Sequence, residues 1–159
     1  MKTPSYIKAF MGADFRNTEG VSLRILMSDL GNKETAKMIK RASGCYVISA
    51  TNRKYTYANS KESPIIYIGL SNNLWRRIYQ DHYLKHYKRL AEDSKFCQRN
   101  NVWMAAKYQY MIHGNARVDI FYCKGKQEQK EFEANLLWNF YLKYDSLPIG
   151  NGARSFSQK

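Results

Sequence analysis

Residues 64–77 read PIIYIGLSNNLWRR. The β-branched and aromatic residues at the start are typical of a buried strand, and the pair Asn72 and Asn73 is typical of a helix N-cap. The stretch therefore predicts a strand that leads through a short turn into a helix. Arg76 and Arg77 fall in the first turns of that helix, where a guanidinium beside a sheet end can hold a phosphate through two hydrogen bonds. The alternative at this point is a buried strand followed by an ordinary basic helix.

The composition indicates a polyanionic partner. The chain has 159 residues, a length that suits one domain with its own core. It contains 26 Lys and Arg against 13 Asp and Glu, a formal net charge of +13. Such an excess is typical of proteins that bind nucleic acid, with an anionic membrane surface as the second candidate. Aromatic residues interleaved with basic ones, as in YLKHYKRL, favour nucleic acid because rings among cations suit base stacking.

Several classes are disfavoured by what the chain lacks. No apolar run approaches the roughly 20 residues of a membrane span and no signal-peptide pattern opens the chain, so we expect a soluble, cytoplasmic protein. Cys45, Cys97 and Cys123 are far apart, which argues against a disulfide framework and a zinc site. His82 and His86 have a ligand-like spacing, but without a third ligand nearby the pattern favours surface or phosphate-facing histidines.

Outward from residues 64–77, strand-like and helix-like segments follow one another. The strand-like segments are 44–50, 64–70 and 116–123. The helix-like segments are 71–93, 100–114 and 127–146. The first two strands predict an antiparallel hairpin with a long polar connection. The order predicts an α/β (α+β) domain with a small, mostly antiparallel three-stranded sheet flanked by helices.

The N-terminal segment over 1–42 is predicted to be an extension packed on this domain. Residues 1–20 show no clear period and are interpreted as an arm. Residues 21–32 predict a short helix, and residues 32–43 a second one with Asn32 as its N-cap. The predicted organisation is this N-terminal extension, a principal domain over 43–153 and a tail over 154–159.

One carboxylate of the last helix needs an explanation. At about 100° per residue, Glu133 falls in the middle of an apolar arc, whereas Glu128 and Glu131 fall on the far side. The arc consists of Phe132, Leu136, Leu137, Phe140 and Tyr144. A carboxylate on a core face is costly unless it is paired, hydrogen-bonded or bound to metal. Glu133 is therefore either an ion-pair partner of a neighbouring element or a metal-binding or proton-handling group.

The helix that follows Asn73 predicts a basic face. Arg76, Lys85, Lys88 and Arg89 are expected to meet phosphates of a nucleic acid without reading its sequence. For Arg77 the alternative is a helix-surface ion pair with Asp81, four positions further on.

Five elements in this order resemble the GIY-YIG nuclease family. They are Gly44-Cys45-Tyr46, Tyr67-Ile68-Gly69, Arg77 at ten positions after Tyr67, Glu133 followed by Leu136-Leu137, and Pro148-x-x-Asn151. The family includes homing endonucleases, some restriction enzymes and the amino-terminal domain of an excision-repair incision enzyme. The resemblance covers about residues 43–153, which makes this segment the expected GIY-YIG nuclease domain.

The resemblance implies phosphodiester hydrolysis with one divalent metal, Mg²⁺ with Mn²⁺ as a substitute, held by Glu133. It implies that Arg77 clamps a phosphate oxygen and that Tyr67 positions the phosphate or the attacking water. Tyr46 would orient or deprotonate that water, and the second role requires neighbours that lower the pKa of a phenol from about 10. Asn151 would brace the site.

The chain departs from the family pattern in three ways. Tyr46 and Tyr67 are farther apart in the sequence than in the family's usual short hairpin, so residues 53–62 resemble an insertion available for DNA contact. The lysine that some members carry beside the second motif is absent, with Lys54 or Lys61 as possible replacements. Many members have Tyr or His fourteen positions after the second-motif tyrosine, where this chain has Asp81. His82 could replace that group only if the helix started one position later, because each residue turns a side chain by about 100°.

The sequence therefore predicts a metal-dependent DNA endonuclease of restriction, mobile-element or repair type, acting on double-stranded DNA. A homodimer on DNA is one way for a single site per chain to cut both strands. The alternative is a non-catalytic nucleic-acid-binding module with the same fold, and a weaker third is a basic protein of a ribonucleoprotein. The expected nucleic-acid contacts are Arg76, His82, Lys85, Lys88, Arg89 and Lys54.

Overall fold

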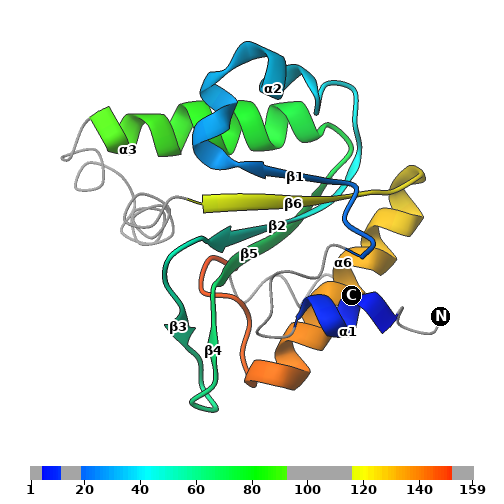
Figure 1. The fold of residues 1–159 in the computed structure, drawn as a ribbon. Coiled ribbons are helices and arrows are strands. Elements are labelled where there is room, and N and C mark those ends of the chain that lie inside the picture. The colour runs from blue at the N-terminus through cyan, green and yellow to red at the C-terminus, as the bar shows by residue number, and fades with distance from the viewer. Residues whose placement is uncertain (1–4, 12–18, 93–115, 152–159) are drawn as a thin grey trace.

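A four-stranded antiparallel sheet forms the centre of the molecule (Figure 1). The structure is a computed structural model, and it describes residues 5–11, 19–92 and 116–151. The strand order of the sheet is β1-β6-β2-β5. The strands are β1 (Leu23–Leu26), β2 (Gly44–Ala50), β5 (Ile65–Ser71) and β6 (Ala116–Tyr122). In Figure 1, α2 and the helix that ends in α3 cover one face, and α1 and α6 cover the other. The predicted mixed α/β class with an antiparallel sheet is confirmed.

The prediction of three strands is wrong, and the helix predicted over residues 21–32 is present only in its second half, because residues 23–26 form the edge strand β1. Strand β1 pairs with β6, with Ile25 opposite Val118, and is followed by the 3-10 helix η1 (Met27–Gly31). Its side chains alternate with period two: Ile25 enters the core, and Arg24 forms an ion pair with Asp119 of β6. A segment of four residues gives too few positions for periodicity to separate a helix from a strand. Pairing with the edge of β6 determines that this segment is a strand.

The two predicted helix caps are local features that the structure contains. Asn32 caps α2 (Lys33–Lys37), since its Oδ1 accepts a hydrogen bond from the Glu34 N–H at 2.9 Å. Asn73 caps the helix after β5 in the same way, accepting from the Arg76 N–H at 3.0 Å. Each cap satisfies a backbone donor that the first helical turn leaves without an intrahelical partner.

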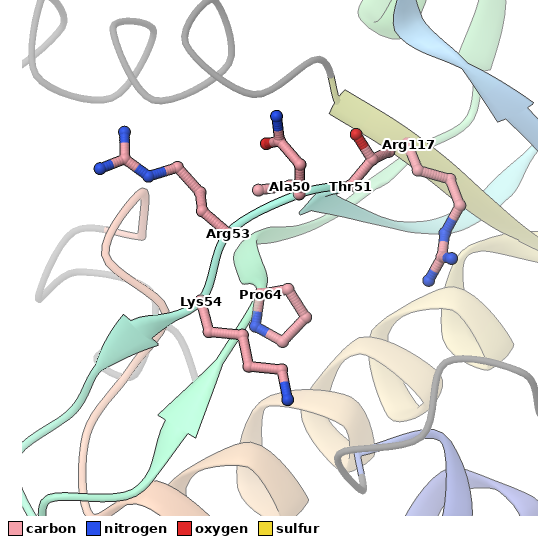
Figure 2. A pocket seen from close by; sticks show the side chains of 7 residues that line it. Ala50, Thr51, Arg53, Lys54, Pro64 and Arg117 are labelled. Atoms are coloured by element: carbon pink, nitrogen blue, oxygen red, sulfur yellow. The ribbon is translucent and has the colours of Figure 1, made fainter.

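The predicted hairpin of β2 and β5 is confirmed, and its connection is structured. Two short strands, β3 (Tyr55–Thr56) and β4 (Glu62–Ser63), pair with each other within it. Tyr57 anchors this small hairpin: its hydroxyl donates to the Ile65 carbonyl at 2.6 Å and accepts from the Ile149 N–H at 3.2 Å. Between β2 and β3, residues 50–54 line a pocket together with Pro64 and Arg117 (Figure 2).

The helix after β5 has an unusual hydrogen-bond pattern. Its first part, η2 (Trp75–Lys88), is a π-helix, and α3 (Arg89–Glu92) continues it. A π-helix bonds residue i to i+5 and so is wider than an α-helix. Four half-buried rings, each four positions after the last, follow one side of it, with successive centroids 5.2, 5.8 and 5.8 Å apart. They are Trp75, Tyr79, Tyr83 and Tyr87.

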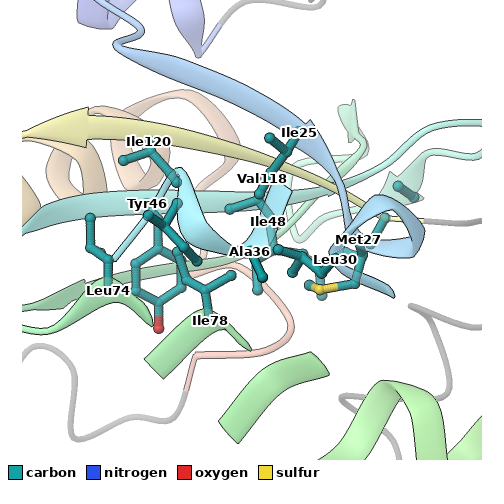
Figure 3. Packing of buried hydrophobic residues seen from close by; sticks show 14 residues of the cluster. Ile25, Met27, Leu30, Ala36, Tyr46, Ile48, Leu74, Ile78, Val118 and Ile120 are labelled. Atoms are coloured by element: carbon teal, nitrogen blue, oxygen red, sulfur yellow. The ribbon is translucent and has the colours of Figure 1, made fainter. Parts of the chain in front are cut away.

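Two apolar cores lie on the two faces of the sheet. One joins the sheet to η1, α2 and η2, and Figure 3 shows Tyr46 in it beside Leu74 and Ile78. The other joins the sheet to α1 (Ser5–Phe10) and α6 (Gly125–Tyr144). Of the α6 residues predicted to be apolar and inward, four are buried and Phe132 is partly buried; the four are Leu136, Leu137, Phe140 and Tyr144.

The N-terminal extension predicted over 1–42 shares a core with the rest of the chain. Its residues Ile25, Met27 and Leu30 belong to the same cluster as Tyr46 and Ile48. The predicted helix over 100–114 and the predicted tail over 154–159 lie outside the described residues. Within the described parts, no helix is at once long enough and apolar enough to cross a membrane.

Candidate active site

The two motif tyrosines meet across a strand pair. Tyr46 of β2 lies opposite Gly69 of β5, and the Tyr46 and Tyr67 ring centroids are 5.8 Å apart. A Cβ on Gly69 would lie 2.7 Å from the Tyr46 hydroxyl oxygen and 2.7 Å from Cε1 of Tyr67. Any larger residue at position 69 would therefore displace both rings. The glycine of this motif is needed for close packing of the tyrosines.

His82 makes a close polar contact to Tyr46. Its Nε2 lies 2.8 Å from the Tyr46 hydroxyl, and both side chains are 0% exposed. The sequence placed His82 among the nucleic-acid contacts, but such burial instead directs its side chain to Tyr46. The sequence also allowed His82 to replace Asp81 only through a later helix start.

The helix starts at its predicted cap, Asn73, but its hydrogen bonds are those of a π-helix and not those of the expected α-helix. In the π-helix η2, residue i+5 lies one turn beyond residue i. His82 therefore lies one turn beyond Arg77, the place that residue i+4 takes in an α-helix. Nothing in the residue pattern signalled this, because the comparison of Asp81 with His82 assumed the α-helical turn of about 100° per residue.

Arg77 lies at the open side of this cluster. Its Nη2 is 3.5 Å from the Tyr67 hydroxyl, and its Nη1 is 3.4 Å from Oδ2 of Asp81. Both interpretations of Arg77 thus have a geometric counterpart, the cluster contact and the i,i+4 pair. Burial acts to lower the pKa of Arg77, but the Tyr46 and Tyr67 hydroxyls raise it more, so the net pKa is raised. The guanidinium keeps its charge, and its side chain is 40% exposed, so a ligand can reach it.

Tyr46 is held in its neutral form. Burial is the largest cause that raises its pKa well above the usual value of 10, and the Tyr67 hydroxyl raises it further. Arg77 acts in the opposite direction but does not compensate for the burial. The base role required neighbours that lower this pKa, and here the pKa is raised. Tyr46 can therefore donate a hydrogen bond or orient a group at neutral pH, and it does not act there as a phenolate.

Asn151 binds the middle of β5. Its Oδ1 accepts from the Ile68 N–H at 3.0 Å, and its Nδ2 donates to the Ile68 carbonyl at 2.8 Å. Gly150 adds an N–H bond to the Ile66 carbonyl at 2.7 Å. The C-terminal segment thus fixes the strand on both sides of Tyr67, a geometry that suits the predicted bracing role.

Glu133 lies on the other side of the sheet from the tyrosine cluster. It is partly buried on α6, whose core includes Cys45, while Tyr46 belongs to the core on the η2 side. It is close to Cys45: the pKa of that thiol is raised by burial first, then by Cys123 and then by Glu133. Among the described residues, no three His, Cys, Asp or Glu side chains gather in a group that could hold a metal ion. An ion at Glu133 would thus rely on one carboxylate and water, a coordination that Mg²⁺ accepts.

The remaining predicted contacts divide into two regions. Arg76, Lys85, Lys88 and Arg89 are exposed along η2 and α3. Lys54 is exposed at the far end of β2, in the pocket of Figure 2.

The sequence reasoning missed the buried Asp119. Its carboxylate is 0% exposed, 3.1 Å from Nε of Arg117 and in an ion pair with Arg24. A signal was available, because an acidic residue between the strand residues Val118 and Ile120 is unusual in a sheet. The partner Arg24 could not be identified, since it lies 95 positions away in the segment predicted as a helix.

Compared with protein-family models, curated proteins and solved structures, the chain matches none of them.

Proposed function

We propose that this chain is a metal-dependent DNA endonuclease of the GIY-YIG type that hydrolyses phosphodiester bonds. One observation carries the proposal: Tyr46, Tyr67, Arg77 and His82, from two strands and a helix, form one cluster. In it His82 contacts the Tyr46 hydroxyl, Arg77 lies beside the Tyr67 hydroxyl, and the two tyrosine rings pack together. Three of the four are residues that the motif resemblance selects. A charged guanidinium, a neutral phenol and an imidazole at hydrogen-bond distance are groups suited to phosphoryl transfer.

The proposed mechanism assigns separate tasks to Arg77, Tyr67 and Tyr46. Arg77 binds a non-bridging oxygen of the scissile phosphate and stabilises the charge that develops there. Tyr67, beside the Arg77 guanidinium, positions that phosphate or the attacking water. Tyr46 keeps its proton and fixes the His82 ring through the 2.8 Å contact. A Mg²⁺ held by Glu133 would stabilise negative charge on the phosphate and the leaving oxygen. Because Glu133 lies on the α6 side of the sheet and Arg77 on the η2 side, this role requires the DNA strand to pass round the end of the sheet between them.

The charge distribution supports DNA as the substrate. The chain carries a formal +13, and the exposed basic residues of η2 and α3 continue from the helix turn that holds Arg77. Contacts of this kind release counterions from DNA, so affinity should fall steeply as salt rises.

A plasmid-nicking assay in Mg²⁺ and in EDTA tests the proposal. Arg77→Ala should lower the nicking rate about 10²–10³-fold, because it removes a transition-state contact. Arg76→Ala is the matched control, since it removes the same charge from the neighbouring exposed residue and should keep most of the rate at saturating DNA. Glu133→Ala should abolish metal-dependent nicking, with Glu131→Ala as its control on the same helix. Thermal unfolding of each variant separates loss of activity from loss of fold.

Equal cutting by wild type, Arg77→Ala and Glu133→Ala would refute the site assignment. Salt-dependent DNA binding without metal-dependent nicking would favour the second candidate, a non-catalytic nucleic-acid-binding module. One observation favours that module: the Tyr46 hydroxyl is fully buried against His82.

A further inference from the structure

A basic pocket lies at the end of β2 that is remote from the candidate active site. Tyr46 and Ala50 are four positions apart on this strand, about 13 Å in an extended chain. The pocket has a volume of about 350 Å³. Its lining residues are Ala50, Thr51, Asn52, Arg53, Lys54, Pro64 and Arg117. This volume is at the lower end of the range found for small-molecule sites.

The charge in this pocket has one sign. Three of its lining side chains are cationic, and none of the described residues that line it is acidic. In the view of Figure 2, the side chains of Lys54 and Arg117 extend to the same side of the strand end. Arg53 extends away from them and lies over the Tyr55 ring, with its Cζ 5.6 Å from the ring centroid. Thr51 and Asn52 add hydroxyl and amide groups able to hydrogen-bond an oxyanion.

An ion pair with Asp119 holds the Arg117 side chain in place. Nε of Arg117 is 3.1 Å from Oδ2 of the buried Asp119, and that carboxylate is shared with Arg24. Two guanidiniums on one carboxylate leave a net positive charge beside the pocket. Burial is the main cause that lowers the pKa of Arg117, and the charge of Arg24 also lowers it, against the effect of Asp119. An anion in the pocket would balance this excess charge.

The segment that carries Arg53 and Lys54 is also held at both ends. Strand β2 precedes it, and the β3–β4 hairpin that follows is anchored by the Tyr57 bonds to Ile65 and Ile149. The hairpin tip is tied to α6, since Asn59 Nδ2 donates to the Lys143 carbonyl at 2.7 Å. The backbone that carries these two cations therefore needs little ordering when a ligand binds, which favours affinity.

We propose that this pocket is a second phosphate-binding site, distinct from the phosphate site at Arg77. The ligand is a phosphate group on a nucleic acid strand or on a free nucleotide, because both present the same oxyanion to Lys54 and Arg117, with Arg53 at the rim of the pocket. The choice of phosphate over other anions rests on the nucleic-acid partner of the proposed function; cleavage is not required. Arg117 and Asp119 lie on the α6 side of β6, whereas Tyr46 lies on the η2 side, so the two sites are independent.

Two titrations in EDTA test this site. The first probe is a DNA duplex of about 20 base pairs, long enough to span two helical turns, and the second is deoxyadenosine monophosphate. In ¹⁵N spectra, the amide signals of residues 51–54 should shift with one or both probes, and Arg53→Gln/Lys54→Gln should abolish the shift. For the duplex, Lys54→Gln should reduce the slope of log K against log salt by about 0.9, the value for one lost phosphate contact. Lys61→Gln is the matched control, because it removes the same charge from an exposed lysine of the same connection, outside the pocket.

Shifts with the duplex alone identify a strand phosphate, and shifts with the nucleotide alone identify a free nucleotide; either result supports the site. No shift with either probe would overturn it, as would an equal loss of slope in Lys54→Gln and Lys61→Gln. Because EDTA prevents turnover, a failure to nick DNA in Mg²⁺ would refute the proposed function and leave these results intact.

Discussion

At the scale of single residues, Tyr46 shows how burial outweighs a neighbouring charge. Its ring fills the space above Gly69, and its hydroxyl meets His82 while Arg77 lies close enough to favour the phenolate. The cost of removing a phenolate from water exceeds the stabilisation that the half-exposed Arg77 guanidinium gives it, so the pKa of Tyr46 is raised. A motif tyrosine thus becomes a proton donor or an orienting group. Its position in the sequence could not distinguish this role from that of a base.

This shift predicts how stability depends on pH. Above about pH 10, Tyr46 ionises in the unfolded chain but stays protonated in the folded one. The free energy of unfolding should therefore fall as pH rises from about 10, by up to about 1.4 kcal/mol per pH unit for this tyrosine. Urea unfolding of wild type and Tyr46→Phe across this alkaline range measures it, and the variant should fall less steeply. Parallel curves would contradict the raised pKa.

At the scale of elements, the hydrogen-bond type of η2 selects which residue faces β2. The cap at Asn73 sets where the helix begins, and the sequence predicted that start. The π pattern then brings His82 to Tyr46 and leaves Asp81 beside Arg77 near the surface. Such a change in helix type is a property of packing against the sheet and η1. It could not be read from the helix sequence alone.

Substitution of two adjacent residues tests this arrangement. His82→Ala should lower the free energy of unfolding by about 2–4 kcal/mol, because it opens a cavity and removes the partner of a buried hydroxyl. Asp81→Ala removes an ion pair between half-exposed groups and should cost at most about 1 kcal/mol. Chemical denaturation of both variants measures the difference. A larger loss for Asp81→Ala would mean that Asp81 faces the sheet, as in a regular α-helix.

At the scale of the whole molecule, β1 makes the N-terminal extension part of the main sheet. It covers the edge of β6 and completes the core with Ile25, Met27 and Leu30. The extension predicted from the sequence is therefore a structural part of the sheet. Exposing the β6 edge would leave backbone groups unpaired and apolar side chains in water.

Neighbouring residues of β1 test its role. Ile25→Asp places a charge at a position 7% exposed in the core and should cost at least about 3 kcal/mol or abolish cooperative unfolding. Leu26→Asp changes a residue 36% exposed and should cost less than about 1 kcal/mol. Circular dichroism during thermal unfolding compares the two variants. Equal, small effects would show that β1 is dispensable for the fold.

The sequence alone determined the features that depend on neighbouring residues: the hairpin strands, the caps at Asn32 and Asn73, and the buried face of α6. Motif spacing also singled out Tyr46, Tyr67 and Arg77, which the fold brings together, while their catalytic roles stay predictions. Only the tertiary structure decided the strand identity of residues 23–26, the burial of His82, the Arg24–Asp119 pair and the basic pocket. Each of these depends on a partner distant in the chain, and a local residue pattern contains no information about which distant edge or side chain will meet it.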